Sequence, residues 1–183
     1  MQTFKEFYIE EGKLGKAIAM GTLAASSVFG NFVDDWSKYY QTTNNPAKEA
    51  RATKVLDAGY TVPSDAKKAI DVAIYIFAGD EGKDAFLLKD YLEKTGAVES
   101  GYRTKVQYGG GPARSYWQVE PETAMDLVKN SSAYFGKKFH RVFGDDALKR
   151  MQGWDKQTWS KMLEKYDSLG AAMAAAKWLA TSW

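Results

Sequence analysis

Glu99 is the residue whose position best suits acid–base chemistry. It ends an apolar stretch that we predict to be a helix from about Gly82 to Val98, and Ser100 and Gly101 follow it directly. The C-terminal end of a helix carries partial negative charge, and aromatic neighbours shield a carboxyl group from water, so both effects favour the protonated form. A protonated carboxyl group can act as a general acid on an oxygen that leaves as a bond breaks. The alternative is a solvated glutamate at a helix end with no catalytic role.

Several short motifs follow one another around Glu99. Residues 95–127 read TGAVESGYRTKVQYGGGPARSYWQVEPETAMDL. Glu99-Ser100, ARSYWQ at residues 113–118 and PETA at residues 121–124 resemble, in this order and spacing, the signature of lytic transglycosylases and goose-type lysozymes, above all those encoded by phages. Those families have Glu-Ser at a helix end, then a Gly-Ala-x-Gly-Leu-Met-Gln-like turn, and then Pro-x-Thr-Ala at the start of the next helix.

The resemblance has a limited extent and a departure in the turn. It is close over residues 97–127, is only a pattern for the helices near Ser64 and Lys161, and does not cover residues 1–62. Ser115 stands where the turn usually has glycine, and serine lacks the freedom of glycine to adopt a positive φ. The family turn is therefore expected here in a modified form.

The resemblance implies an enzyme that cleaves the β-1,4 bond between MurNAc and GlcNAc in peptidoglycan. Glu99 would protonate the leaving oxygen and then remove the proton of the MurNAc C6 hydroxyl, which closes a 1,6-anhydro ring without water. The N-acetyl group can assist, so one carboxyl group suffices, and we interpret Glu120, Glu122 and Asp126 as partners of a helix dipole.

The resemblance also implies which side chains hold the substrate. Ser100 would orient the Glu99 carboxyl group, and Gln118 would bond to sugar or order the floor of the cleft. Aromatic rings present flat apolar surfaces to the apolar faces of sugars. The aromatic candidates for such stacking are Tyr116, Trp117 and Tyr166. Each of these residues has a structural alternative: a helix-terminal serine, an amide bonded to backbone, or a core aromatic ring.

The composition excludes several other kinds of site. The 183 residues include no cysteine and one histidine, so disulfides, iron–sulfur clusters, a cysteine nucleophile and sites with several His ligands are ruled out. We interpret that histidine, His140, as structural, and residues 137–141 as a solvated helix face or a contact for an anionic polymer. The YGGGP loop at residues 108–112 lacks the Gly-Lys-Ser/Thr sequel of a phosphate-binding loop, so we expect a flexible cleft rim. We expect no metal or other cofactor.

Three regions of the chain differ in composition. Residues 1–33 join a charged, aromatic start to an uncharged stretch, for which a packing or membrane-touching helix, a secretory signal and a transmembrane helix compete. Residues 34–62 are predicted to be a connector with one short helix in AKEARATKVLDAG. Residues 63–183 are predicted to form the lysozyme-like catalytic domain.

Helical spacing dominates from residue 63 onward. Ser64 is predicted to cap a helix that ends near Ala78-Gly79-Asp80. Its apolar face is Ala66, Ile70, Ala73, Ile74 and Phe77. The helix over 82–98 has the core stripe Leu87, Leu88, Tyr91 and Leu92. A third helix opens at Pro121 and turns inward Met125, Leu127 and Val128. One long last helix begins near Trp154 or Thr158 and carries the seam Met162, Tyr166, Leu169, Met173 and Ala176. No strand pattern appears, so the fold is predicted to be mainly α with little or no β.

The expected setting follows from the resemblance and from the charge. The phage-encoded type implies a lysin in a virion or its tail, or in the bacterial periplasm and cell envelope, with peptidoglycan strands as substrate. Expected partners are other phage structural proteins and a membrane touched by residues 1–33. A net charge of +2 does not predict nucleic-acid binding and does not oppose an anionic cell-wall polymer. Two alternatives stay open: a non-catalytic structural or cell-wall-binding virion protein, and a lysozyme-type hydrolase.

Overall fold

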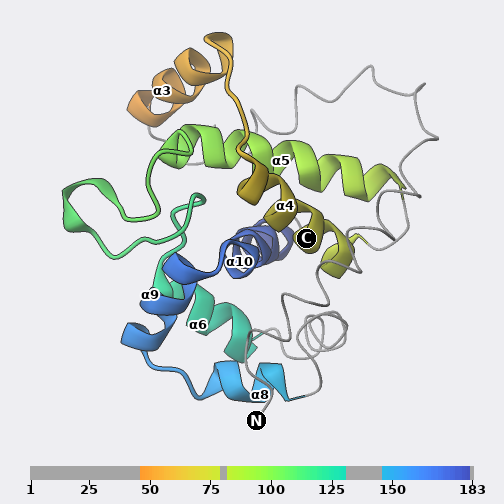
Figure 1. Ribbon diagram of the computed structural model, residues 1–183, viewed down its shortest axis with the longest axis vertical. Coiled ribbons are helices and arrows are strands. Elements are labelled where there is room, and N and C mark those ends of the chain that lie inside the picture. The colour runs from red at the N-terminus through yellow and green to blue at the C-terminus, as the bar shows by residue number, and fades with distance from the viewer. Residues whose placement is uncertain (1–45, 79–81, 131–145, 182–183) are drawn as a thin grey trace.

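A computed structural model describes residues 46–78, 82–130 and 146–181 (Figure 1). The interpretations of residues 1–33, of residues 34–45, of His140 and of residues 137–141 concern parts of the chain outside this description. The helices are α3 (Pro46–Asp57), α4 (Ser64–Phe77), α5 (Gly82–Ser100), α6 (Pro121–Asn130), α8 (Ala147–Gln152), α9 (Lys156–Lys165) and α10 (Asp167–Thr181), with a 3-10 turn η1 (Tyr108–Gly110). Strand-like pairing in the described residues is limited to two isolated bridges, so the mainly α prediction is confirmed.

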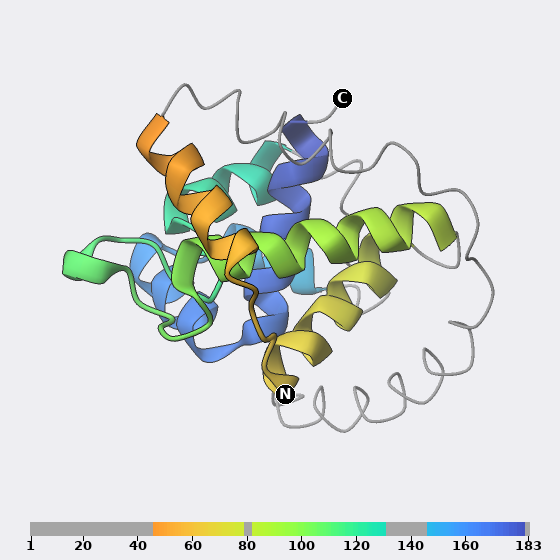
Figure 2. The same cartoon turned by 90° about the horizontal axis from the view of Figure 1, so that it is seen from above.

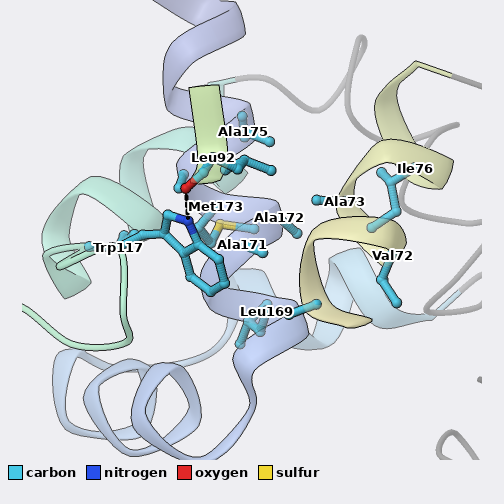
Figure 3. Close-up of a cluster of buried hydrophobic side chains, with 14 of the residues drawn as sticks. Val72, Ala73, Ile76, Leu92, Trp117, Leu169, Ala171, Ala172, Met173 and Ala175 are labelled. Carbon is cyan, nitrogen blue, oxygen red and sulfur yellow. Dashed lines mark hydrogen bonds between the residues drawn. The ribbon is translucent and has the colours of Figure 1, made fainter. Parts of the chain in front are cut away.

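Helix α10 is the centre of the fold. Figure 1 shows it close to end-on, with α4, α5, α6 and α9 packed around it. Its residues 168–176 are all buried, and most of them are alanine, whose small side chains allow the surrounding helices to approach closely. Figure 3 shows Ala171, Ala172, Met173 and Ala175 of α10 beside Ala73 and Ile76 of α4 and Leu92 of α5.

The region predicted as a connector contains a packed helix. Helix α3 lies across α5 (Figure 2), and a small apolar cluster joins the two. In this cluster Ala52 and Val98 are buried, with Val55 and Leu56 beside them. The contact is near the C-terminal end of α5, so α3 supports the helix turn that carries Glu99.

One long helix was predicted for the last part of the chain, and this is wrong. The helix breaks at Tyr166, whose φ of −118° and ψ of 104° are extended, and α10 begins at the next residue. No glycine or proline marks the break. The predicted seam is nevertheless apolar on both sides of it, because Leu169 and Met173 are buried and Met162 packs against the same core.

The predicted boundaries of two other helices also change. Ser64 does not cap α4, because Pro63 occupies the capping position and no side-chain cap is formed. Asp65 instead accepts the Ala66 N–H at 3.0 Å, which satisfies one of the free donors at this helix start. Helix α5 extends to Ser100 rather than Val98, so Glu99 belongs to its last turn.

Candidate active site

Glu99 is half-buried in the last turn of α5. Because a helix has 3.6 residues per turn, Leu92, Gly96 and Glu99 lie on one face of α5. Gly101 follows with a left-handed φ of 59° and donates its N–H to the Ala97 carbonyl oxygen at 3.0 Å. Helices often end in this way, and a residue with a Cβ atom would be strained there. The carboxyl group therefore lies where a helix stops and an irregular loop begins.

The sequence suggested that Ser100 orients the Glu99 carboxyl group. Its hydroxyl proton instead closes the end of helix α5. Its buried hydroxyl donates to the Gly96 carbonyl oxygen at 3.0 Å and accepts the Tyr102 N–H at 3.1 Å. A serine hydroxyl has one proton to donate, and the backbone takes it. The structural alternative for Ser100 is therefore the one that the geometry supports.

Tyr102 reverses the chain so that its ring lies back along α5. Its φ of 55° is left-handed, and its hydroxyl donates to the Glu93 carbonyl oxygen at 2.9 Å. A Cβ atom on Gly96 would lie 2.6 Å from the Tyr102 hydroxyl oxygen, so the ring needs a glycine at this position. Burial raises the pKa of the Tyr102 phenol well above its usual range. The ring therefore covers the α5 face that Glu99 shares, one turn before it, and sequence reasoning missed this residue.

Residues 114–119 form a short hairpin whose turn is SYWQ. Arg114 and Val119 exchange both backbone hydrogen bonds, at 2.9 and 2.8 Å. Ser115 and Gln118 both adopt a left-handed φ, of 67° and 49°. Ser115 thus takes a conformation that glycine adopts more easily, at a cost of about 1 kcal/mol or more. The turn therefore contains a serine in a conformation that is rare for residues other than glycine.

Helix α10 meets this turn at Gly170. A Cβ atom on Gly170 would lie 2.7 Å from Ser115 Oγ and closer still to Ser115 Cβ. Ser115 is completely buried, and its hydroxyl accepts the Trp117 N–H at 3.3 Å. The absence of a side chain at residue 170 is therefore what lets the turn rest directly on the central helix.

Trp117 is a core residue and not a stacking platform, so its predicted contact with sugar is wrong. Its indole is buried, and Nε1 donates to the Leu92 carbonyl oxygen at 2.9 Å, as Figure 3 shows. This bond ties the turn to α5 on the face that carries Glu99. Gln118 is half-buried, and its Nε2 donates to the Ser115 carbonyl oxygen at 2.8 Å, so its amide holds its own turn.

Tyr116 is a partly exposed residue of the hairpin, and its side chain contacts helix α4. Its hydroxyl donates to Asp65 Oδ2 at 3.0 Å, and its ring meets the Tyr102 ring edge-on with centroids 5.5 Å apart. Burial and the hydrogen bond to Asp65 raise its pKa to about 12, so the phenol stays neutral at ordinary pH. Of the predicted stacking residues, Tyr116 is the one that keeps an exposed surface.

Tyr166 is buried at the break between α9 and α10, so the prediction that it stacks on sugar is wrong.

The acidic residues near α6 are at the surface. Glu120 precedes the helix, Glu122 is in its first turn and pairs with Lys156, and Asp126 is exposed. The positions of Glu120 and Glu122 agree with the interpretation of helix-dipole partners, whereas Asp126 lies beyond the first turn of α6.

The Gly-rich loop extends outward from the packed helices, as Figures 1 and 2 show. Its base is braced, because the Gln107 N–H bonds to the Ala113 carbonyl oxygen at 3.2 Å and the Arg114 guanidinium bonds to the Gly111 carbonyl oxygen at 2.7 Å. At its tip Tyr108 is 68% exposed. The loop therefore holds an aromatic ring in solvent, which sequence reasoning also missed.

Three comparisons with known proteins give no relative: no family model, no curated protein and no solved structure matches the chain. In the described ranges, no helix has the length and apolarity to cross a membrane. The same ranges hold no group of three or more His, Asp or Glu side chains that could bind a metal ion.

Proposed function

We propose that this protein cleaves peptidoglycan as a lytic transglycosylase, with Glu99 as the catalytic acid and then the base. The observation that carries the proposal is the position of Glu99. It is half-buried in the last turn of α5, on the face to which Tyr102 and the Trp117 turn are bonded. A general acid must reach the substrate from a fixed position, and the last turn of α5 holds Glu99 in one.

The order of elements around Glu99 supports the same proposal. A long helix ends in Glu99-Ser100, a hairpin with two left-handed residues carries Gln118, and Pro121 opens the next helix. These are the three places at which the sequence resembles lytic transglycosylases and goose-type lysozymes. We include in the proposal the setting that the resemblance implies, a phage virion or tail, or the bacterial cell envelope.

The proposed reaction uses one carboxyl group. Glu99 gives its proton to the glycosidic oxygen as the bond from MurNAc C1 breaks, and GlcNAc leaves with a free hydroxyl. The MurNAc N-acetyl oxygen supports the positive charge at C1. The Glu99 carboxylate then takes the proton of the C6 hydroxyl while its oxygen bonds to C1, which restores the acid and closes the anhydro ring. Glu120, Glu122 and Asp126 are exposed. Their positions favour this scheme over one in which any of them acts as a second catalytic carboxylate beside Glu99.

The first test replaces Glu99 by glutamine, which keeps the size of the side chain and removes its acidity. Glu99→Gln is expected to lower muropeptide release from purified sacculi by roughly a hundredfold or more, because general acid catalysis contributes about that much. Glu120→Gln, at an exposed carboxyl group nearby, is the matched control and should keep the wild-type rate. Circular dichroism and the thermal midpoint should match the wild type for both variants.

The products distinguish the remaining alternatives. Mass spectrometry should find 1,6-anhydro ends, which are lighter by one water than reducing ends. Reducing ends would replace the proposed mechanism by lysozyme-type hydrolysis. A folded wild-type protein that binds sacculi and releases nothing would instead favour the non-catalytic cell-wall-binding or structural virion protein.

A further inference from the structure

Three other segments of the chain meet at Lys105. Its Nζ lies 2.8 Å from Oδ2 of Asp167, the first residue of α10, and 3.9 Å from Oδ2 of Asp65 in the first turn of α4. It also lies 4.9 Å from the centre of the Tyr116 ring, whose hydroxyl bonds to the same Asp65 oxygen. We call these residues, Lys105, Asp65, Asp167 and Tyr116, the Lys105 cluster.

The cluster joins two irregular segments, the loop that follows Glu99 and the turn that carries Gln118, to the packed helices α4 and α10. Lys105 belongs to the loop that leaves α5 just after Glu99, and Tyr116 belongs to the turn that carries Gln118. Asp65 and Asp167 belong to helices α4 and α10, which pack closely on each other. The loop and the turn are thus attached to one firm base.

We propose that Lys105 is a positioning residue, whose ammonium group fixes the loop after Glu99 and the turn of Gln118 against the N-terminal ends of α4 and α10. The part of this statement that concerns catalysis rests on the proposed role of Glu99. The part that concerns the loop and the turn stands on the contacts alone.

The Lys105–Asp167 pair differs from an ordinary surface ion pair. The side chain of Asp167 is 13% exposed and that of Lys105 is 30% exposed. The second oxygen of Asp167, Oδ1, is buried without a hydrogen-bond partner, so the carboxylate depends on the bond that Lys105 donates to Oδ2. Removal of one partner from a largely buried pair leaves an uncompensated charge, whereas an exposed pair contributes little. Lys156 and Glu122, which are 59% and 51% exposed, form such an exposed pair.

The charges around Asp167 make the attachment sensitive to acid. Burial raises the pKa of Asp167, the hydrogen bond and charge of Lys105 oppose this, and the charge of Asp65 adds to it. Of the other groups in the cluster, the Tyr116 phenol stays neutral, and the Asp65 carboxylate faces Lys105 at 3.9 Å. A carboxyl group with a raised pKa binds its proton more tightly in the folded chain, so protonation of Asp167 does not itself unfold the protein. It does remove the negative charge that holds Lys105, so the loop is released while the fold persists.

The test measures backbone amide hydrogen exchange over residues 101–119, expressed as protection factors so that the intrinsic effect of pH cancels. Lys105→Met is expected to lower protection there by about tenfold, between the small effect of losing an exposed pair and the larger effect of losing a fully buried one. Lys105→Arg should restore it, and Lys156→Met, which breaks the exposed pair, should match the wild type. The rate of muropeptide release should follow the same order across these three variants.

The wild type supplies a second measurement that needs no change at Lys105. As the pH falls from neutral toward the raised pKa of Asp167, protection over residues 101–119 should fall, and Asp167→Asn should abolish this dependence. Equal protection in Lys105→Met and Lys156→Met would overturn the proposal. If Lys105→Met does not fold, a wild-type pH series without any change over 101–119 would overturn it equally. Failure of the proposed function would show differently, as absence of muropeptide release from a wild type whose exchange responds as expected.

Discussion

Gly170→Ala should destabilise the protein, although the same change in most helix interiors is favourable. Alanine in place of glycine inside a helix ordinarily contributes about 1 kcal/mol. Here the new methyl group would lie 2.7 Å from Ser115 Oγ and nearer still to Ser115 Cβ, within a completely buried turn. Ordinary contacts of a Cβ atom begin at about 3.4 Å, so the turn or the helix must move.

The size of the effect follows from what holds the turn in place. The backbone pairing of Arg114 with Val119 and the bond of Trp117 to Leu92 oppose a shift. Overpacking of a well-ordered core costs about 1–3 kcal/mol, and we take the upper half because the obstructing atoms are close to backbone. Against the helix gain, the net loss is about 1–2 kcal/mol. For a chain of this size, that lowers the thermal midpoint by roughly 3–6 °C.

The assay is urea and thermal unfolding of a double-mutant cycle. Ser115→Gly removes the atoms that the new methyl group at residue 170 would meet and relieves a left-handed serine. The double variant should therefore be more stable than Ser115→Gly alone by about 1 kcal/mol, the ordinary helix gain of alanine. Gly153→Ala is the control, because its Cβ atom would lie 3.5 Å from the Arg150 carbonyl oxygen, an ordinary contact. Additive effects of Gly170→Ala and Ser115→Gly, or a gain in stability from Gly170→Ala alone, would refute the close approach of α10 and the turn.

Two further predictions concern the core and its charges. Trp117→Phe removes the indole donor from the Leu92 carbonyl and leaves a space, so we expect urea unfolding to show a loss of about 1–3 kcal/mol; an unchanged midpoint would mean that the turn is not anchored there. Burial raises the pKa of Asp71, Glu93 and Asp167. The folded state therefore binds more protons than the unfolded chain between their ordinary values, 3.8 for aspartate and 4.5 for glutamate, and their raised values. Through these groups, the thermal midpoint should rise as the pH falls into that window, and a fall there would contradict their burial.

Local signals allowed some of the fold to be predicted from the sequence. Pro121 opens α6 because its missing N–H and fixed φ suit the first position of a helix. Val128 is buried and Met125 and Leu127 are partly buried, as their spacing predicted. The end of α5 near Glu99 was also visible, since Ser100 and Gly101 interrupt the apolar pattern. Each of these features depends on residues that are close in sequence.

The errors arose where distant segments decide the structure. The chain between Lys165 and Asp167 has no helix-breaking residue, yet α10 must turn at Tyr166 to enter the centre of the fold. Asp167 at that turn bonds to Lys105, a partner far away in sequence.

Contacts between distant segments also explain why the roles of the site residues were mispredicted. An aromatic ring in SYWQ can face solvent or core, and only the packed turn shows that Trp117 faces the core while Tyr116 keeps an exposed edge. Sequence spacing therefore located the candidate acid, but it could not assign roles to the side chains around it.

The central position of α10 has a consequence for synthesis of the protein. Helices α4, α5 and α6 leave the ribosome before the helix on which their apolar faces pack. Until residues 167–181 emerge, those faces have no complete partner, and incompletely packed apolar surfaces promote aggregation of nascent chains. The core can thus assemble only after translation of α10, and a nascent chain that stalls before Asp167 is a natural client for chaperones.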